Sequence, residues 1–154
     1  MEVILIAAIT TDGYIARHHH EVIQWSKDLS LFKELTWGWP VIIGANTKAT
    51  LDRDLIGREL IVVHRSDDPQ QVLNRIKARK CFVAGGGKTN ARFAPYLTQL
   101  FLTIHPLVFG RGVPLFDGLN RELNLTLEEV KPVSGRQGIY QFRYRTNSDI
   151  GHIT

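Results

Sequence analysis

The chain has 154 residues, of which 44% are hydrophobic and 22% charged, and its net charge is +4. This length predicts one domain over residues 1–154, because such a chain buries about two-thirds of its unfolded surface around a single core. A mean hydropathy of -0.10 argues against a disordered or membrane protein. The longest apolar run, residues 3–9, is far shorter than the ~20 residues of a membrane-spanning helix.

The lone cysteine and the N-terminus indicate a cytoplasmic location. Cys81 has no partner for an internal disulfide, which fits a reducing compartment. Its apolar neighbours favour a buried structural thiol over a nucleophile. Glu2 stands where a signal peptide would carry basic residues. No basic stripe is interleaved with aromatic residues, so we expect no nucleic-acid partner, and the mild positive charge is compatible with a small anionic ligand.

Apolar runs of strand character alternate with helical stretches along most of the chain. The runs are apolar on both faces, which is typical of strands buried inside a parallel sheet. They predict strands over residues 2–9, 40–44, 60–63, 80–84 and 100–104.

Three helices are expected between these strands. Ser26 is a suitable N-cap for a helix over residues 27–36. A second helix is expected over residues 67–78, because its two leading aspartates and Pro69 favour a first helical turn. A third follows the glycines at 85–87 and extends to about residue 96.

The C-terminal part changes character. Residues 123–130 and 138–145 alternate apolar and polar side chains, with Gly135 and Gly138 between them, which predicts an antiparallel hairpin. The whole pattern predicts an α/β fold: a single domain with a mostly parallel central sheet flanked by helices and a C-terminal antiparallel hairpin.

The three consecutive glycines at 85–87 are the most conspicuous motif. They follow a buried strand and precede a helix, so uncovered backbone N–H groups and the helix dipole could hold a pyrophosphate. The motif is neither a Walker loop, since Phe82 stands where its first glycine belongs, nor a complete G-x-G-x-x-G, since Asn90 occupies the last position. The alternative is a tight strand-to-helix turn without a ligand.

Two kinds of titratable residue are candidates for chemistry. Asp28, near the start of a helix, could hold a raised pKa in an apolar cleft and exchange protons with a heterocycle, or could only complement the helix dipole. His18, His19 and His20 are consecutive, so their side chains diverge, and we expect an exposed loop and no metal site. His105, at a strand end, is expected to be a structural histidine.

These segments together resemble the dihydrofolate reductase superfamily over nearly the whole chain. No single piece is distinctive, but their order and spacing are. The segments that carry the resemblance are Leu5–Ile9 with Asp12–Ile15, Trp25–Thr36, Pro40–Thr47, Gly57–Val63, Val83–Gly87 and Leu100–Thr103.

The resemblance implies a fold, an activity and roles for particular residues. Proteins of this family reduce a C=N bond of a heterocycle with hydride from NADPH. By this likeness Asp28 and Thr103 are the catalytic pair. The substrate would contact Ile6, Ala7, Ala8, Phe32, Arg58 and Ala84. The cofactor would contact Ala8, Ile15, Gly44, Asn46, Thr47, Arg65, Ser66, Gly85, Gly86, Gly87, Lys88 and Thr89, with Arg65 and Ser66 at the extra ribose phosphate. The first two glycines match a pair joined by a cis peptide in the family.

Three departures keep the substrate open. Ala45 stands where dihydrofolate reductases usually carry a basic residue, and Trp25 lies closer to Asp28 than the tryptophan of their mobile loop. Residues 44–47 followed by Asp52, Leu55 and Arg58 are instead similar to the riboflavin-pathway reductase, and residues 106–116 to small stand-alone reductase-like proteins of unassigned substrate, where they build a dimer face.

Dihydrofolate is the favoured substrate because Asp28, Phe32, Thr36, Arg58 and Thr103 all match. The riboflavin-pathway diaminopyrimidine ribosyl phosphate is the alternative, and Arg58 would hold a carboxylate in one case and a phosphate in the other. Other classes are an NADP(H)-binding sensor without catalysis and a phosphate-binding structural module. A homodimer is a further possibility of the resemblance.

Overall fold

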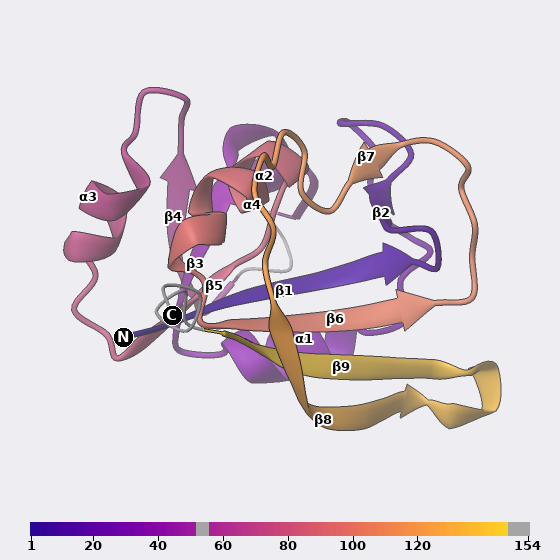
Figure 1. The fold of residues 1–154 in the computed structure, drawn as a ribbon. Coiled ribbons are helices and arrows are strands. Elements are labelled where there is room, and N and C mark those ends of the chain that lie inside the picture. The colour runs from indigo at the N-terminus through magenta and orange to yellow at the C-terminus, as the bar shows by residue number, and fades with distance from the viewer. Residues whose placement is uncertain (52–55, 148–154) are drawn as a thin grey trace.

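The computed structural model describes residues 1–51 and 56–147, and for residues 49–51 it describes the backbone alone. Its main sheet has the strand order β4-β3-β5-β1-β6-β9-β8 (Figure 1). The five strands from β4 to β6 are parallel, whereas β9 is antiparallel to β6 and to β8. The predicted fold class is therefore confirmed. The strands are β1 (Glu2–Thr10), β3 (Pro40–Gly44), β4 (Glu59–Val63), β5 (Lys80–Val83), β6 (Gln99–His105), β8 (Leu125–Ser134) and β9 (Ile139–Thr146).

A second, two-stranded sheet pairs β2 (Tyr14–Ala16) with β7 (Val113–Pro114). It was not predicted, because three and two residues are too short to show a period.

β8 is an edge strand of the main sheet. Its first eight residues are exposed, and its pairing with β9 is interrupted by two register shifts.

The helices begin and end at different residues than expected. α1 (Leu29–Thr36) begins after Asp28 and not after Ser26, because Asp28 contributes the first carbonyl, which accepts the Phe32 N–H at 2.9 Å. The predicted N-cap at Ser26 was therefore wrong. α3 (Pro69–Asn74) begins after Asp68, as the acids predicted, but ends four residues early in tight turns through Arg75 and Ile76.

The remaining helices lie at the carboxyl ends of strands. α4 (Gly87–Phe93) follows the glycines and continues into a 3₁₀ turn, η2 (Ala94–Tyr96), as predicted. α2 (Ala45–Leu51) follows β3 directly and was not predicted, because asparagine and threonine are weak helix formers. A 3₁₀ turn, η3 (Gly135–Gln137), joins β8 and β9 and ends at Gly138, whose positive φ of 71° accounts for the glycine there.

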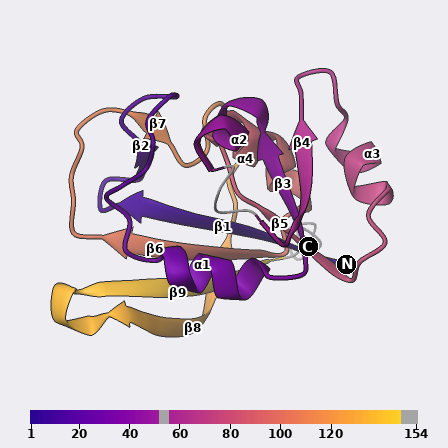
Figure 2. The same ribbon diagram turned by 180° about the vertical axis from the view of Figure 1, so that it is seen from behind.

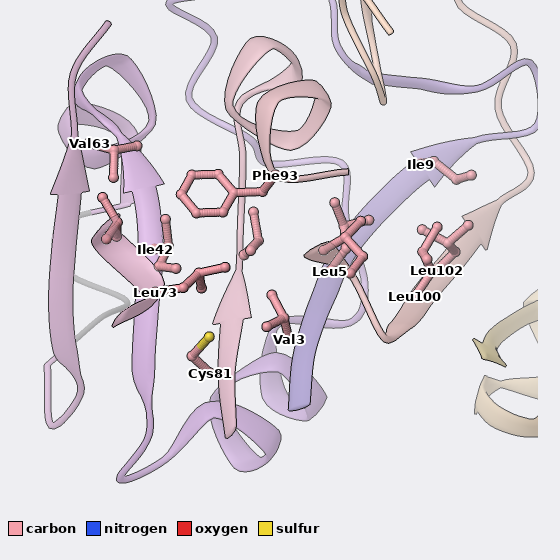
Figure 3. Packing of buried hydrophobic residues seen from close by; sticks show 13 residues of the cluster. Val3, Leu5, Ile9, Ile42, Val63, Leu73, Cys81, Phe93, Leu100 and Leu102 are labelled. Carbon is pink, nitrogen blue, oxygen red and sulfur yellow. The ribbon is translucent and has the colours of Figure 1, made fainter. Parts of the chain in front are cut away.

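Two apolar clusters cover the two faces of the sheet. One cluster joins side chains of the central strands to Leu73 of α3 and Phe93 of α4 (Figure 3). The other joins Ile4, Ile6 and Phe82 to Phe32 and Leu35 of α1, which lies across the opposite face, toward the viewer in Figure 2. None of the helices within the described residues is both long and apolar enough to cross a membrane.

Cys81 lies in the core of β5, fully buried, as predicted (Figure 3). Burial raises the pKa of its thiol to about 11, so the reactive thiolate is scarce at neutral pH. We expect a thiol reagent such as Ellman's reagent to label the native protein only as fast as it unfolds, and the denatured protein at once. Fast labelling of the native protein would contradict this burial.

Candidate active site

A cavity of about 1340 Å³ lies at the carboxyl ends of the parallel strands. It is bordered by Ala7 and Ala8 of β1, Gly44 of β3, Val63 of β4 and Ala84 after β5. From β1 the chain continues to β3 and β4, which lie on one side of β1 in the sheet. It then returns to β5, next to β1, and crosses to β6 on the other side of β1. Ligands of open α/β sheets bind at such a reversal of strand order, because the connections leave the sheet on opposite faces there.

The cavity floor is a close approach of two strand ends. The Gly44 N–H donates to the Gly85 carbonyl at 2.9 Å, and the Gly85–Gly86 peptide is cis, as the resemblance implied. A Cβ at Gly44 would lie 2.7 Å from Thr89 Oγ1, and one at Gly86 would lie 3.3 Å from Thr47 Oγ1. A side chain at Gly44 would therefore displace Thr89, and the uncovered backbone leaves room for a ligand against the main chain.

The structure brings the predicted cofactor residues together around one cavity, with one exception. Ser66 is exposed and is not among the residues that border it. The residues that do border it are Ala8, Ile15, Gly44, Asn46, Thr47, Arg65, Gly85, Gly86, Gly87, Lys88 and Thr89.

Asp28 is a buried carboxyl group at the other end of the same cavity. It is only 7% exposed, although it stands at the N-cap position of α1, where its side chain makes no capping hydrogen bond. Burial raises its pKa, and the Thr103 hydroxyl opposes that rise. The carboxyl group is therefore not used as a helix cap, and it can act as an acid toward a ligand.

Thr103 of β6 is fully buried. Its hydroxyl is close enough to lower the pKa of Asp28, yet among the described residues Thr103 Oγ1 has no hydrogen-bond partner of normal geometry. An unsatisfied buried hydroxyl is costly, so it marks a place where a bound polar group would be stabilised.

The predicted substrate residues divide into two groups. Ile6, Ala7, Ala8, Phe32 and Ala84 border the cavity and give it an apolar wall beside Asp28. Arg58 does not: it borders a separate surface depression with Lys33, Glu34 and Trp37.

Three nitrogens of Arg58 are engaged at the C-terminal end of α1. Nε donates to Thr36 Oγ1 at 3.0 Å, Nη1 to the Ile56 carbonyl at 2.5 Å, and Nη2 to the Lys33 carbonyl. Since helix ends leave carbonyls unsatisfied, the bond to the Lys33 carbonyl caps the end of α1. A guanidinium has five N–H groups, so an anion-binding role for Arg58 stays a prediction. Asp52 and Leu55, which share with Arg58 the spacing similar to the riboflavin-pathway reductase, lie outside the described residues.

The loop before α1 contributes more to the cavity than the sequence indicated. His18, His19 and His20 are exposed, as expected, but they also border the cavity, together with Gln24 and Ser26. Their position shortly before Asp28 was the available signal. Within residues 1–51 and 56–147, no three His, Cys, Asp or Glu side chains are grouped to hold a metal ion.

An open α/β sheet with a glycine-lined cavity at its switch point is an arrangement in which α/β proteins bind nucleotide ligands, and here the cavity also holds a buried acid. The dihydrofolate reductase family model matches residues 2–111, so the chain belongs to the dihydrofolate reductase family.

Individual relatives agree with this assignment. The dihydrofolate reductase of Bacillus subtilis (strain 168) is 33% identical over 110 residues, which are 62% of this chain and 66% of that protein. The type 3 dihydrofolate reductase of Salmonella typhimurium is 31% identical over 117 residues, 67% of this chain and 71% of that protein. A crystal structure of a candidate riboflavin biosynthesis protein from Shewanella sp. PV-4 shares the fold, with a TM-score of 0.69 and 20% identity over 96% of this chain and 100% of that one.

Proposed function

We propose that this protein is an NADPH-dependent reductase of a pterin-type heterocycle, with dihydrofolate as the substrate. The observation that carries the proposal is Asp28: a carboxyl group that is buried, not used as a helix cap, and open to a large cavity with an apolar wall. An amino-pyrimidine edge offers two parallel N–H groups, which a carboxylate can accept. The relatives at 31–33% identity are dihydrofolate reductases, which supports this substrate.

The cavity fits a dinucleotide. No side chain covers the floor at Gly44, Gly85 and Gly86, so a flat ring or a phosphate can approach the main chain there. Asn46 and Thr47 at the start of α2 add polar groups, and Lys88 and Arg65 add positive charge. When bound, NADPH supplies the hydride.

The residues of the chain act by binding and by proton control. Ile6, Ala7 and Phe32 exclude water from the reacting ring, which strengthens electrostatic interactions inside the cavity. Asp28 orients the ring and, because burial raises its pKa, holds a proton near the ring nitrogen at higher pH than an exposed aspartate would. Thr103 supplies a hydroxyl to the same polar end.

The test is the absorbance of NADPH with two substrates in separate reactions: dihydrofolate and the diaminopyrimidine ribosyl phosphate of the riboflavin pathway. We expect oxidation of NADPH with dihydrofolate. Oxidation only with the pyrimidine would assign the riboflavin role. Binding of NADPH without oxidation would favour a sensor. A ligand at 100 times its Kd adds ~2.7 kcal/mol to the free energy of unfolding. If NADPH in large excess over the protein adds nothing to that free energy, the glycines form only a turn.

Arg65 is expected to select NADPH over NADH. It is exposed at the cavity rim after β4, where a guanidinium can pair with a phosphate dianion. Arg65→Gln should raise the Kd for NADPH about tenfold, which corresponds to the loss of one charge-assisted interaction, and leave the Kd for NADH unchanged. Lys77→Gln removes the same charge from an exposed site outside the cavity and is the control. Equal effects on both cofactors would contradict this role.

A further inference from the structure

We propose that His105 is a positioning residue for Asp28, which it controls through the backbone of Lys27. The inference rests on the proposed function, because it concerns the acid of that site. His105 is 1% exposed, at the end of β6, two residues after Thr103. Alternate residues of a strand point to the same face, so Thr103 and His105 both project on the side where Asp28 lies.

Both ring nitrogens of His105 have partners, and these partners define the tautomer. Nε2 accepts the Lys27 N–H at 2.9 Å and is therefore unprotonated. The proton is then on Nδ1, which donates to the Thr103 carbonyl at 3.0 Å. The imidazole thus joins the strand that carries Thr103 to the residue that precedes Asp28.

The hydrogen bond from the Lys27 N–H to His105 holds the backbone on the N-terminal side of Asp28. On the C-terminal side, the Asp28 carbonyl accepts the Phe32 N–H and belongs to α1. The Asp28 side chain makes no capping bond that would hold it in place. Besides the nearby Thr103 hydroxyl, its direction depends on the two peptide groups beside it, one held by α1 and one next to the Lys27 N–H that His105 holds.

The ring of His105 is itself held in place by aromatic packing. Trp25 lies edge-on to it, with ring centroids 5.2 Å apart, and Phe109 lies edge-on to Trp25 at 5.4 Å. The Asp12 carboxylate in turn accepts the N–H groups of Phe109, at 3.2 Å, and Gly110, at 2.8 Å. The loop after β6 and the loop before α1 therefore meet at His105, whose ring has hydrogen-bond or aromatic contacts on several sides.

The test is a pair of substitutions that separate the two hydrogen bonds. Asparagine places its amide where Nδ1 lies, so His105→Asn keeps the Thr103 partner and loses the acceptor for Lys27. Glutamine reaches the place of Nε2, so His105→Gln keeps that acceptor. We expect kcat of His105→Asn to fall about tenfold with the Kd for NADPH unchanged, and His105→Gln to restore most of kcat.

A measurement without substrate distinguishes this inference from the proposed function. In His105→Asn we expect the Lys27 amide to exchange its hydrogen about tenfold faster or more, and in His105→Gln to regain protection. In the wild type, the ¹⁵N shifts of His105 should show a protonated Nδ1 and a bare Nε2 at neutral pH. A wild-type enzyme that oxidises no NADPH would refute the proposed function, while the exchange data would still test the link.

Three results would overturn the inference. The first is wild-type kcat and wild-type Lys27 exchange in His105→Asn. The second is a fall in melting temperature in both variants with no loss of kcat, which would indicate a merely structural histidine. The third, which holds even where neither variant folds, is a protonated Nε2 in the wild-type spectrum.

Discussion

Asp28→Asn is expected to lower kcat by about 100-fold or more at neutral pH, the usual contribution of a positioned acid or base. The asparagine keeps the shape of the side chain but has no proton to exchange and pairs differently with an amino-pyrimidine edge. The Kd for NADPH should change little, because the cofactor contacts proposed above lie around the glycines. Glu34→Gln removes a carboxylate from an exposed position of α1 outside the cavity and should leave kcat unchanged. Full turnover in Asp28→Asn would refute the assignment of the acid.

The raised pKa of Asp28 also predicts how kcat and stability depend on pH, and it predicts that the substitution that lowers kcat raises stability at neutral pH. In the wild type, kcat should fall as the pH rises through the raised pKa of the folded enzyme, because the carboxyl group then loses its proton. The folded state also loses stability as the pH rises from the ordinary aspartate pKa through the raised one, since ionising a buried carboxyl costs free energy. Asp28→Asn should therefore have the higher melting temperature at about pH 7, with the difference shrinking toward about pH 3. A variant that is less stable at neutral pH would contradict this sign.

Gly87→Ala is expected to destabilise the protein by about 1–3 kcal/mol and to weaken NADPH binding about tenfold or more. A Cβ at Gly87 would lie 2.5 Å from the Pro114 carbonyl oxygen and 3.0 Å from Asp117 Cβ, and backbone cannot move aside cheaply. The Gly87 carbonyl also accepts the Asp117 N–H at 3.0 Å. The start of α4 must therefore shift, and Lys88 and Thr89 shift with it at the cavity wall.

The matched control for Gly87→Ala is Gly135→Ala. A Cβ at Gly135 would make only an ordinary contact, 3.6 Å from the Tyr140 hydroxyl. Thermal unfolding should show a fall of about 2–4 °C per kcal/mol for Gly87→Ala and almost none for Gly135→Ala. NADPH titration of both proteins at a temperature where both are folded separates affinity from stability. Equal affinities would show that the start of α4 does not contact the cofactor.

The parallel part of the sheet was predictable because its strands are apolar on both faces. The runs that became β1, β3, β4, β5 and β6 contain almost no polar residue, and such runs form strands in parallel sheets. The pairing order within the sheet was not predicted from these runs, because it depends on contacts between residues far apart in the chain. The helix starts were less predictable: Ser26 and Asp28 are both good N-caps, and only the tertiary position of the chain decides between them.

The candidate site was predictable where backbone requirements limit the residue type. The glycines after β5 were a candidate ligand site from their context, the acid before α1 became a candidate through the family resemblance, and the structure places both at one cavity. The surroundings of Arg58 were not predictable, because a free arginine and a helix-capping arginine have the same sequence signature. The dimer face expected at residues 106–116 and the roles of individual site residues stay predictions.

The outer strand β8 bears on how copies of this chain can meet. A long exposed edge usually invites a strand from another molecule, but this one carries Glu128, Glu129, Lys131 and Pro132 in its middle, and its pairing with β9 is irregular at two points. Charges, a proline and bulges prevent the regular hydrogen bonding that continuing a sheet requires. The β8 edge is therefore a poor place for a strand of a second copy to continue the sheet.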